Sequence, residues 1–216
     1  MAIILDNVGT MYQDTDYGKS GATLSFTVAN NSNRILIVSV LNSNRNTTGV
    51  TYNGVAMTNL YGVNGSKSFW YLLNPSVGTY NIVASFSSYP TGGSLNAISY
   101  YGVDSIGAWN MSTNNYISSL TTTITPTKKA SLLLAMIYCA DSLGSVGSGQ
   151  TLRLDSAPSY HQAGFSDKPN TSLAANSLSW AFQNATGSNT SYLGVLELVD
   201  VVQPAGTNAS LLYALT

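Results

Sequence analysis

Apolar residues recur along this chain at the alternating spacing of β-strands, and helix-like spacing is nearly absent. In residues 23–28, Leu24, Phe26 and Val28 alternate with Thr and Ser. We expect these three apolar side chains to face a core and the hydroxyls between them to face water. Residues 34–41 are apolar at nearly every position, which predicts a strand in the centre of a sandwich, buried on both faces. The pattern therefore predicts an all-β protein.

Turn residues separate the apolar runs. Asn53-Gly54 lies between strand formers and predicts a hairpin with a type I′ turn, because both residues tolerate positive φ. Residues 157–176 form the longest stretch that we expect to be irregular. Taken together, the apolar runs predict strands over residues 3–5, 23–28, 34–41, 51–57, 68–73, 79–86, 95–101, 120–124, 131–139, 151–154, 178–182 and 192–199.

We expect one antiparallel sandwich over residues 1–200, because turn signals are spread evenly and neither an internal repeat nor a shift in composition is evident. Residues 201–216 have a different pattern. Pro204 and Gly206 interrupt strand pairing, and a new apolar segment follows at residues 209–216. This segment has no evident partner strand within the chain. The predicted fold is a single antiparallel β-sandwich with a linker and an extra terminal strand.

Four segments occur in an order that carries a family resemblance: Ser-Asn-Arg-Ile-Leu-Ile-Val (32–38), Val-Thr-Tyr-Asn-Gly-Val-Ala-Met-Thr (50–58), Phe-Trp-Tyr-Leu-Leu-Asn-Pro-Ser-Val-Gly-Thr-Tyr-Asn-Ile-Val (69–83) and Tyr-Gly-Val-Asp (101–104). The chain resembles a widespread family of jelly-roll-like β-sandwich domains found in bacterial surface proteins and in phage tail or virion proteins. The resemblance covers residues 3–199 and implies a structural or adhesive module, commonly without known enzymatic activity. Such domains often finish soon after the strand that corresponds to residues 193–199, so the tail departs from the pattern.

Charge is scarce in this chain. Only 8% of its 216 residues are charged, against about 25% in an ordinary soluble protein, and amides, hydroxyls and 14 Tyr fill the polar positions. A net charge of -1 gives no basic field that would collect phosphates or anionic lipid, so nucleic acid is not an expected partner. No segment approaches the roughly 18 apolar residues of a membrane helix, so we expect no membrane insertion.

Few residues are available for catalysis or metal binding. His161 is the only histidine and no Gly-x-Ser-x-Gly motif is present, so we expect no enzyme; a hydrolase that uses His161 is a remote alternative. Glu197, the sole glutamate, is expected to point away from the core without a partner carboxylate for glycoside hydrolysis. Asp14 and Asp16 would suit calcium, although a solvated loop is the simpler interpretation. We expect no cofactor.

Exposed aromatic and amide side chains offer possible contacts. Trp180 alternates with core residues, whereas Trp109 lies among Gly, Asn and Ser and is expected to be exposed. The candidate ligand contacts are Trp109, Tyr116 and Tyr160. Asn-x-Ser/Thr sequons in predicted loops give possible glycan attachment sites at Asn46, Asn64, Asn110, Asn170, Asn184 and Asn189.

The first functional hypothesis is a non-enzymatic subunit of an extracellular or cell-surface filament, a homopolymer in which a terminal strand inserts into the neighbour's sandwich. Residues 209–216 are the candidate donor strand, and residues 3–5 are the competing donor. The assembly contact would come from apolar side chains on both faces of the C-terminal strand, namely Leu211, Tyr213 and Leu215 on one face and Leu212 on the other.

The second hypothesis is a carbohydrate-binding or receptor-binding module, or a decoration, on the surface of a phage tail or virion. It follows from the family resemblance and from the candidate aromatic contacts. It predicts a closed trimer or an attached decoration rather than an open fibre. The two hypotheses differ in whether the chain polymerises.

Overall fold

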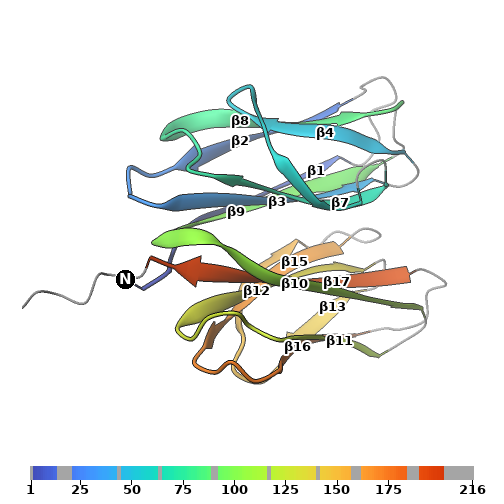
Figure 1. Ribbon diagram of the computed structural model, residues 1–216. Helices are drawn as coiled ribbons and strands as arrows, with labels where there is room; N and C mark the ends of the chain where they lie inside the picture. The colour runs from blue at the N-terminus through green and yellow to red at the C-terminus, as the bar shows by residue number, and fades with distance from the viewer. Residues whose placement is uncertain are drawn as a thin grey trace, which may run out of the picture.

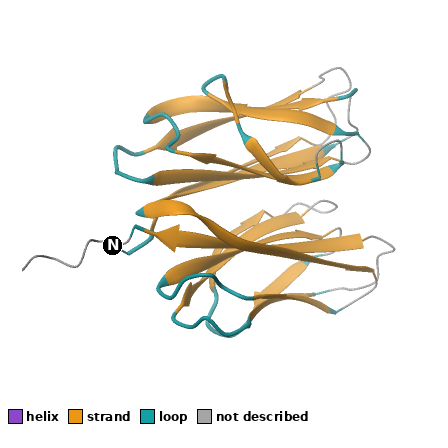
Figure 2. Ribbon diagram, in the orientation of Figure 1, coloured by secondary structure: helices purple, strands orange, loops and turns teal. Residues whose placement is uncertain are grey.

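Seventeen β-strands and no helix make up the part of the computed structural model that is described (Figures 1 and 2). Every pairing between these strands is antiparallel. The predictions of an all-β fold and of antiparallel sheets are therefore confirmed. The structure describes residues 2–13, 21–42, 45–62, 65–88, 92–115, 118–139, 142–156, 162–183 and 190–201.

The strands form four sheets that stack as four layers (Figure 1). The inner N-terminal sheet has the order β1 (Ile4–Gln13), β9 (Gly93–Tyr101), β3 (Arg34–Asn42), β7 (Lys67–Leu73), β6 (Thr58–Tyr61). The outer N-terminal sheet has the order β2 (Gly21–Val28), β8 (Gly78–Phe86), β4 (Thr47–Tyr52), β5 (Val55–Ala56). The inner C-terminal sheet has the order β10 (Val103–Asn115), β17 (Thr190–Asp200), β12 (Ser131–Cys139), β15 (Gln162–Asn170), β14 (Thr151–Ser156). The outer C-terminal sheet has the order β11 (Ser119–Ile124), β16 (Asn176–Phe182), β13 (Leu143–Val146).

Three large hydrophobic cores, and a small fourth cluster of Leu41, Tyr138 and Ala163, hold the layers together. The N-terminal core lies between the two N-terminal sheets, the C-terminal core lies between the two C-terminal sheets, and the central core joins the two inner sheets. The strands therefore form two sandwiches, from residues 4–101 and 103–200, rather than the single sandwich expected from the sequence. Composition gave no sign of this division, because both halves use the same uncharged residue types.

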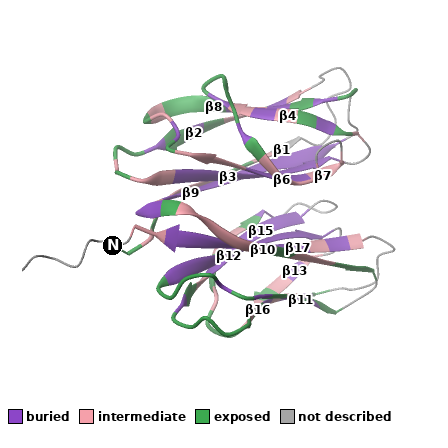
Figure 3. Ribbon diagram, in the orientation of Figure 1, coloured by how far each residue is buried: buried purple, intermediate pink, exposed green. Residues whose placement is uncertain are grey.

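The stacking explains why two strands are apolar on both faces (Figure 3). On β3, Ile35 and Ile37 enter the central core, and Leu36 enters the N-terminal core. On β12, Leu134 enters the central core and Leu133 enters the C-terminal core. Because side chains alternate along a strand, a strand in the middle of an inner sheet buries both of its faces and is apolar at most positions.

The same strand order occurs in both halves, although no repeat is evident in the sequence. The order β1-β9-β3-β7-β6 corresponds to β10-β17-β12-β15-β14, and β2-β8-β4 corresponds to β11-β16-β13. The residues that precede β3 and β12 share an unusual backbone, since Asn33 has φ 56 and Ala130 has φ 58. The chain thus builds one topology twice, and β5 is the strand without a counterpart in the described part of the second half.

Some of the local predictions are confirmed and others are wrong. The type I′ turn is confirmed, because Asn53 has φ 49 and Gly54 has φ 75 between β4 and β5. Exposed hydroxyls alternate with core residues along β2 as expected. In contrast, β15 lies within the stretch expected to be irregular, and β10 was not expected at all. Both strands carry Gly and several polar residues, which weaken the strand pattern.

Candidate functional site

The arrowhead of β17 lies beside the N-terminus at one end of the molecule (Figure 1). The N–H of Val201 donates to the carbonyl oxygen of Gly102 at 3.2 Å. Gly102 has φ 79, and a Cβ at this position would lie 2.7 Å from the carbonyl oxygen of Ala2. The position therefore requires glycine. The N-terminus, the link between the sandwiches and the start of the C-terminal segment are gathered here.

A groove of about 440 Å³ opens beside these chain ends, and we refer to it as the terminal groove. Asp200, the last residue of β17, stands at its edge, so the C-terminal segment starts from the groove. The starts of β1 and β12 and the end of β15 supply the other walls. The groove is lined by Ala2, Ile3, Ala130, Ser131, Leu132, Pro169, Asn170, Thr171 and Asp200.

Buried hydrogen bonds fix the shape of the terminal groove. The side-chain amide of Asn170 donates to the carbonyl oxygen of Lys128 at 2.9 Å and to Oγ of Ser131 at 3.0 Å. Leu132 is buried in the central core, and Ile3 packs against that core. The groove is preformed and mostly apolar, so it is suited to accept an aliphatic or aromatic side chain.

The N-terminal strand is already paired within its own chain. Ile4 lies opposite Tyr101 and Leu5 lies opposite Tyr100, so both belong to β1 of the inner N-terminal sheet. The candidate contact residues of the C-terminal strand lie outside the described residues, namely Leu211, Leu212, Tyr213 and Leu215.

Trp109 is half-buried and packs against the central core. Its ring meets Phe69 nearly edge-on, with 6.1 Å between the ring centroids. It also covers Gly194, where a Cβ would lie 2.5 Å from the indole ring. Trp109 is therefore half-buried rather than exposed as expected, because Phe69 of the first sandwich packs against it. The other two candidate ligand contacts, Tyr116 and Tyr160, lie outside the described residues.

A buried carboxylate links the two sandwiches. Oδ2 of Asp167, on β15, accepts hydrogen bonds from the hydroxyl of Tyr100, on β9, and from Nε of Arg153, each at 2.7 Å. Burial, followed by the charge of Asp167, raises the pKa of Tyr100 well above its ordinary value. The hydrogen bond to Asp167 raises the pKa of Arg153. This cluster joins β9 of the first sandwich to β15 and β14 of the second. It could not be predicted from the sequence, because β15 was expected to be a loop.

Glu197 is fully buried, contrary to the expectation that it points outward. Its carboxylate accepts hydrogen bonds from the backbone N–H groups of Ala108 (2.9 Å), Thr127 (2.8 Å) and Lys128 (3.0 Å), and from the Thr127 hydroxyl (2.9 Å). Burial alone would raise the pKa of Glu197, but these hydrogen bonds together bring it below its ordinary value. The residue ties the loop after β11 to the sandwich, which is a structural role.

The sequons within the described residues differ in whether the asparagine side chain is accessible for attachment of a glycan. Asn46 is exposed, and its side-chain amide makes no hydrogen bond to another described residue. Asn110 is exposed, but its amide donates to the carbonyl oxygen of Thr123 at 2.7 Å. Asn170 is 1% exposed, so a glycan cannot be attached to it in the folded chain. The other candidate sequons, Asn64, Asn184 and Asn189, lie outside the described residues.

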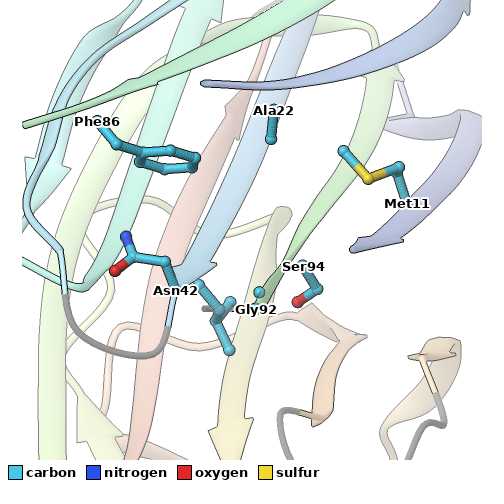
Figure 4. Close-up of a pocket in the computed structure, with 8 residues that line it drawn as sticks. Met11, Ala22, Asn42, Phe86, Gly92 and Ser94 are labelled. Carbon is cyan, nitrogen blue, oxygen red and sulfur yellow. The ribbon is translucent and has the colours of Figure 1, made fainter. Parts of the chain in front are cut away.

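A second, much smaller cavity lies at the end of the N-terminal core (Figure 4). Its volume is about 10 Å³, which is room for roughly one water molecule. It is therefore too small to hold a ligand. Its lining residues are Met11, Ala22, Leu41, Asn42, Phe86, Gly92, Gly93 and Ser94.

Asp14, Asp16 and His161 lie outside the described residues, so the structure adds nothing on calcium or on the hydrolase alternative. Within the described ranges, no three His, Cys, Asp or Glu side chains come together as a metal site would need. Cys139 is buried in the C-terminal core. The described part contains no helix with the length and apolar character needed to cross a membrane.

Comparisons of the chain with protein-family models, with curated proteins and with solved structures returned no match. Arguments about function therefore rest on this chain's own residues and geometry.

Proposed function

We propose that this protein is a non-enzymatic structural subunit of an extracellular filament, in which the C-terminal segment 209–216 of one subunit inserts as a β-strand into a sandwich of the next. The observation that carries the proposal is the point from which the tail starts. It starts from Asp200, at the edge of a preformed, mostly apolar groove. An apolar segment that follows a Pro-containing and Gly-containing linker has the composition of a donor strand.

The linker is long enough for the segment to leave its own subunit. The eight residues 201–208 span at most about 26–29 Å when fully extended. The terminal strand of one subunit and the acceptor on the next are different surfaces. Such a contact is heterologous, and when it does not close into a ring it extends into a fibre.

The N-terminal strand is the weaker donor candidate. Its pairing with β9 would have to be broken before it could enter a neighbour. Burial of a large apolar side chain contributes roughly 1.5–3 kcal/mol, whereas ordering costs about 1–2 kcal/mol per residue. Leu211, Leu212, Tyr213 and Leu215 therefore need the backbone hydrogen bonds of a full strand in addition to their burial.

We further propose that the first sandwich is a jelly roll, as the family resemblance implies. With β6 set aside, the order β1-β9-β3-β7 packed on β2-β8-β4-β5 supports this assignment. These are the first, eighth, third and sixth strands of eight, packed on the second, seventh, fourth and fifth, as in a double Greek key.

The test is deletion of residues 202–216 followed by negative-stain electron microscopy. We expect filaments to disappear while the thermal unfolding midpoint stays the same, because both sandwiches are complete by Asp200. Combined Leu211→Ser, Tyr213→Ser and Leu215→Ser should have the same effect. Leu212→Ser, on the opposite face of the strand, is the matched control and should weaken assembly less. Unchanged filaments after the deletion would sink the proposal.

A further inference from the structure

The outer C-terminal sheet has one strand fewer than the outer N-terminal sheet. In the first sandwich the order is β2-β8-β4-β5, and β5 pairs with β4 through Tyr52 and Val55. In the second sandwich the corresponding order β11-β16-β13 ends at β13, which pairs only with β16 among the described strands. The side of β13 that faces away from β16 is therefore without a strand in the described part of the chain, and we refer to it as the β13 edge.

Backbone groups of β13 point toward this open side. The N–H of Gly147 donates to the carbonyl oxygen of Ser179, on β16, at 2.9 Å. Because successive backbone groups of a strand point to opposite sides, those of Val146 point away from β16. The N–H of Leu143 is bonded to a side chain instead of a strand, namely Oε1 of Gln162 at 2.6 Å. This side-chain oxygen takes the place that the carbonyl oxygen of a neighbouring strand would take.

An apolar side chain beside the β13 edge is left uncovered. Leu152, on β14, lies opposite Ser166 of β15 and shares its face of the inner C-terminal sheet. Ser166 alternates with Phe165, whose ring enters the central core, so this face is turned toward the outer C-terminal sheet. Leu152 is nevertheless 47% exposed. Five inner strands face only three outer strands, so a strand added at the β13 edge would extend the outer sheet over β14 and cover Leu152.

An asparagine side chain bonds the edge strands together on the other side of each sandwich. The amide of Asn7, on β1, donates to the carbonyl oxygen of Thr27, on β2, at 2.9 Å. The amide of Asn110, on β10, donates to the carbonyl oxygen of Thr123, on β11, at 2.7 Å. The oxygen of each asparagine also accepts the N–H of the residue that follows it, at 2.9 Å. Since these groups already have partners, the β13 edge is the better site for an added strand in the outer C-terminal sheet.

We propose that residues 209–216 of a neighbouring copy pair with the β13 edge, as a fourth strand of the outer C-terminal sheet in the place that β5 has in the first sandwich. The inference rests on the proposed filament function and names its acceptor. Leu211, Tyr213 and Leu215 face β14 and cover Leu152, whereas the residues between them face solvent. Neither β13 nor residues 209–216 carry a charged side chain, so the pairing buries no charge.

Disulfide trapping in filaments of the full chain tests the acceptor. Ser145, which is exposed on β13, is changed to Cys. Ser145→Cys is combined, in separate variants, with Ser210→Cys, Leu212→Cys or Ala214→Cys on the face of the tail that points to solvent. After oxidation, we expect at least one variant to give a ladder of dimers, trimers and larger species on a non-reducing gel, because cross-strand neighbours are close enough for a disulfide. The ladder should collapse to monomer in reductant, and the native Cys139 is buried.

Val55→Cys, combined with the same three tail substitutions, is the matched control. Val55 is 49% exposed on β5, at the corresponding side of the first sandwich, and these variants should stay monomeric on the gel. The β13 acceptor is overturned if no Ser145→Cys variant gives a ladder, if the Val55→Cys variants give one instead, or if the disulfide forms within one chain. Deletion of residues 202–216 separates the two proposals. Filaments that vanish on deletion but give no ladder reject the acceptor alone, whereas filaments that survive the deletion reject both.

Discussion

The two sandwiches share one strand order but use different residues to tie down the same loop. In the first half, Asp6 on β1 accepts hydrogen bonds from the Ser99 hydroxyl (2.8 Å) and from the N–H of Ala29 (3.2 Å), just after β2. In the second half, Glu197 on β17 accepts four hydrogen bonds, three of them from the loop just after β11. A carboxylate holds the loop in both halves, but it comes from opposite members of a strand pair. Both sandwiches thus have a hydrogen-bond acceptor beside this loop, but the shared topology does not determine which strand supplies it.

In the central core, by contrast, both sandwiches place a phenylalanine ring at corresponding positions. Phe69 lies opposite Ser39 of β3, as Phe165 lies opposite Met136 of β12, and both rings enter the central core. Each inner sheet therefore presents a phenylalanine ring to the other, although the residues opposite the rings differ, Ser39 in one sheet and Met136 in the other. The two sandwiches are thus alike in the phenylalanine rings that they place in the central core, whereas the carboxylates that hold their loops come from different strands.

The largest expected effect on stability tests whether Phe69 and Phe165 are equivalent in the central core. Phe69→Ala and Phe165→Ala should each lower the free energy of unfolding by about 3–5 kcal/mol, because each removes a buried ring from the same core. Urea denaturation should give the two losses within about 1 kcal/mol of each other. A loss confined to one variant would contradict the equivalence.

Removing the carboxylate that holds the loop should lower the free energy of unfolding more in the second sandwich than in the first. Glu197→Ala removes the acceptor of three backbone N–H groups and one hydroxyl, and we expect a loss of about 3 kcal/mol. Asp6→Ala removes two bonds from a half-buried residue and should cost about 1 kcal/mol. Urea denaturation of both variants measures the difference, and equal losses would show that the two ties do not differ in strength.

A smaller effect should appear on acidification. The pKa of Glu197 is lowered in the folded chain, so its ionised form stabilises the fold above the unfolded value of about 4.3. That stability is lost as pH falls through the folded pKa. Between about pH 4.5 and pH 2.5, the wild type should therefore lose more free energy of unfolding than Glu197→Gln. Parallel pH profiles would exclude this role for the carboxylate.

The smallest expected effect on stability is that of a glycan. Asn46 and Asn170 both lie in Asn-x-Ser/Thr sequons. A glycan on exposed Asn46 should leave the unfolding free energy nearly unchanged, whereas Asn170 is closed by its bonds to Lys128 and Ser131. Mass spectrometry of peptides from the native material should find any modification at Asn46 and none at Asn170. A glycan on Asn170 would mean that attachment precedes folding.

Periodicity and turn chemistry predicted much of the fold. Trp180 was expected beside Leu178 and Phe182 on a core face, and all three are buried in the C-terminal core. The type I′ turn at Asn53-Gly54 follows from the conformational freedom of these two residues. These features depend on neighbours in the sequence, so they can be predicted from it.

The features that were missed depend on contacts between distant segments. Glu197 sits in a strand whose pattern places it among core residues, but its hydrogen-bonding partners lie about 70–90 residues away. Trp109 has polar neighbours in sequence and is covered by Phe69 from the other sandwich. The terminal groove is built from four separate segments, so no single stretch could have indicated it.

The most direct test of the account is a cryo-electron microscopy map of the native assembled material. The account predicts filaments in which continuous density leaves the terminal groove at Asp200 and ends as residues 209–216, strand-paired within the adjacent subunit. A map in which each tail returns to its own sandwich, or in which subunits associate without the tail, would contradict the account.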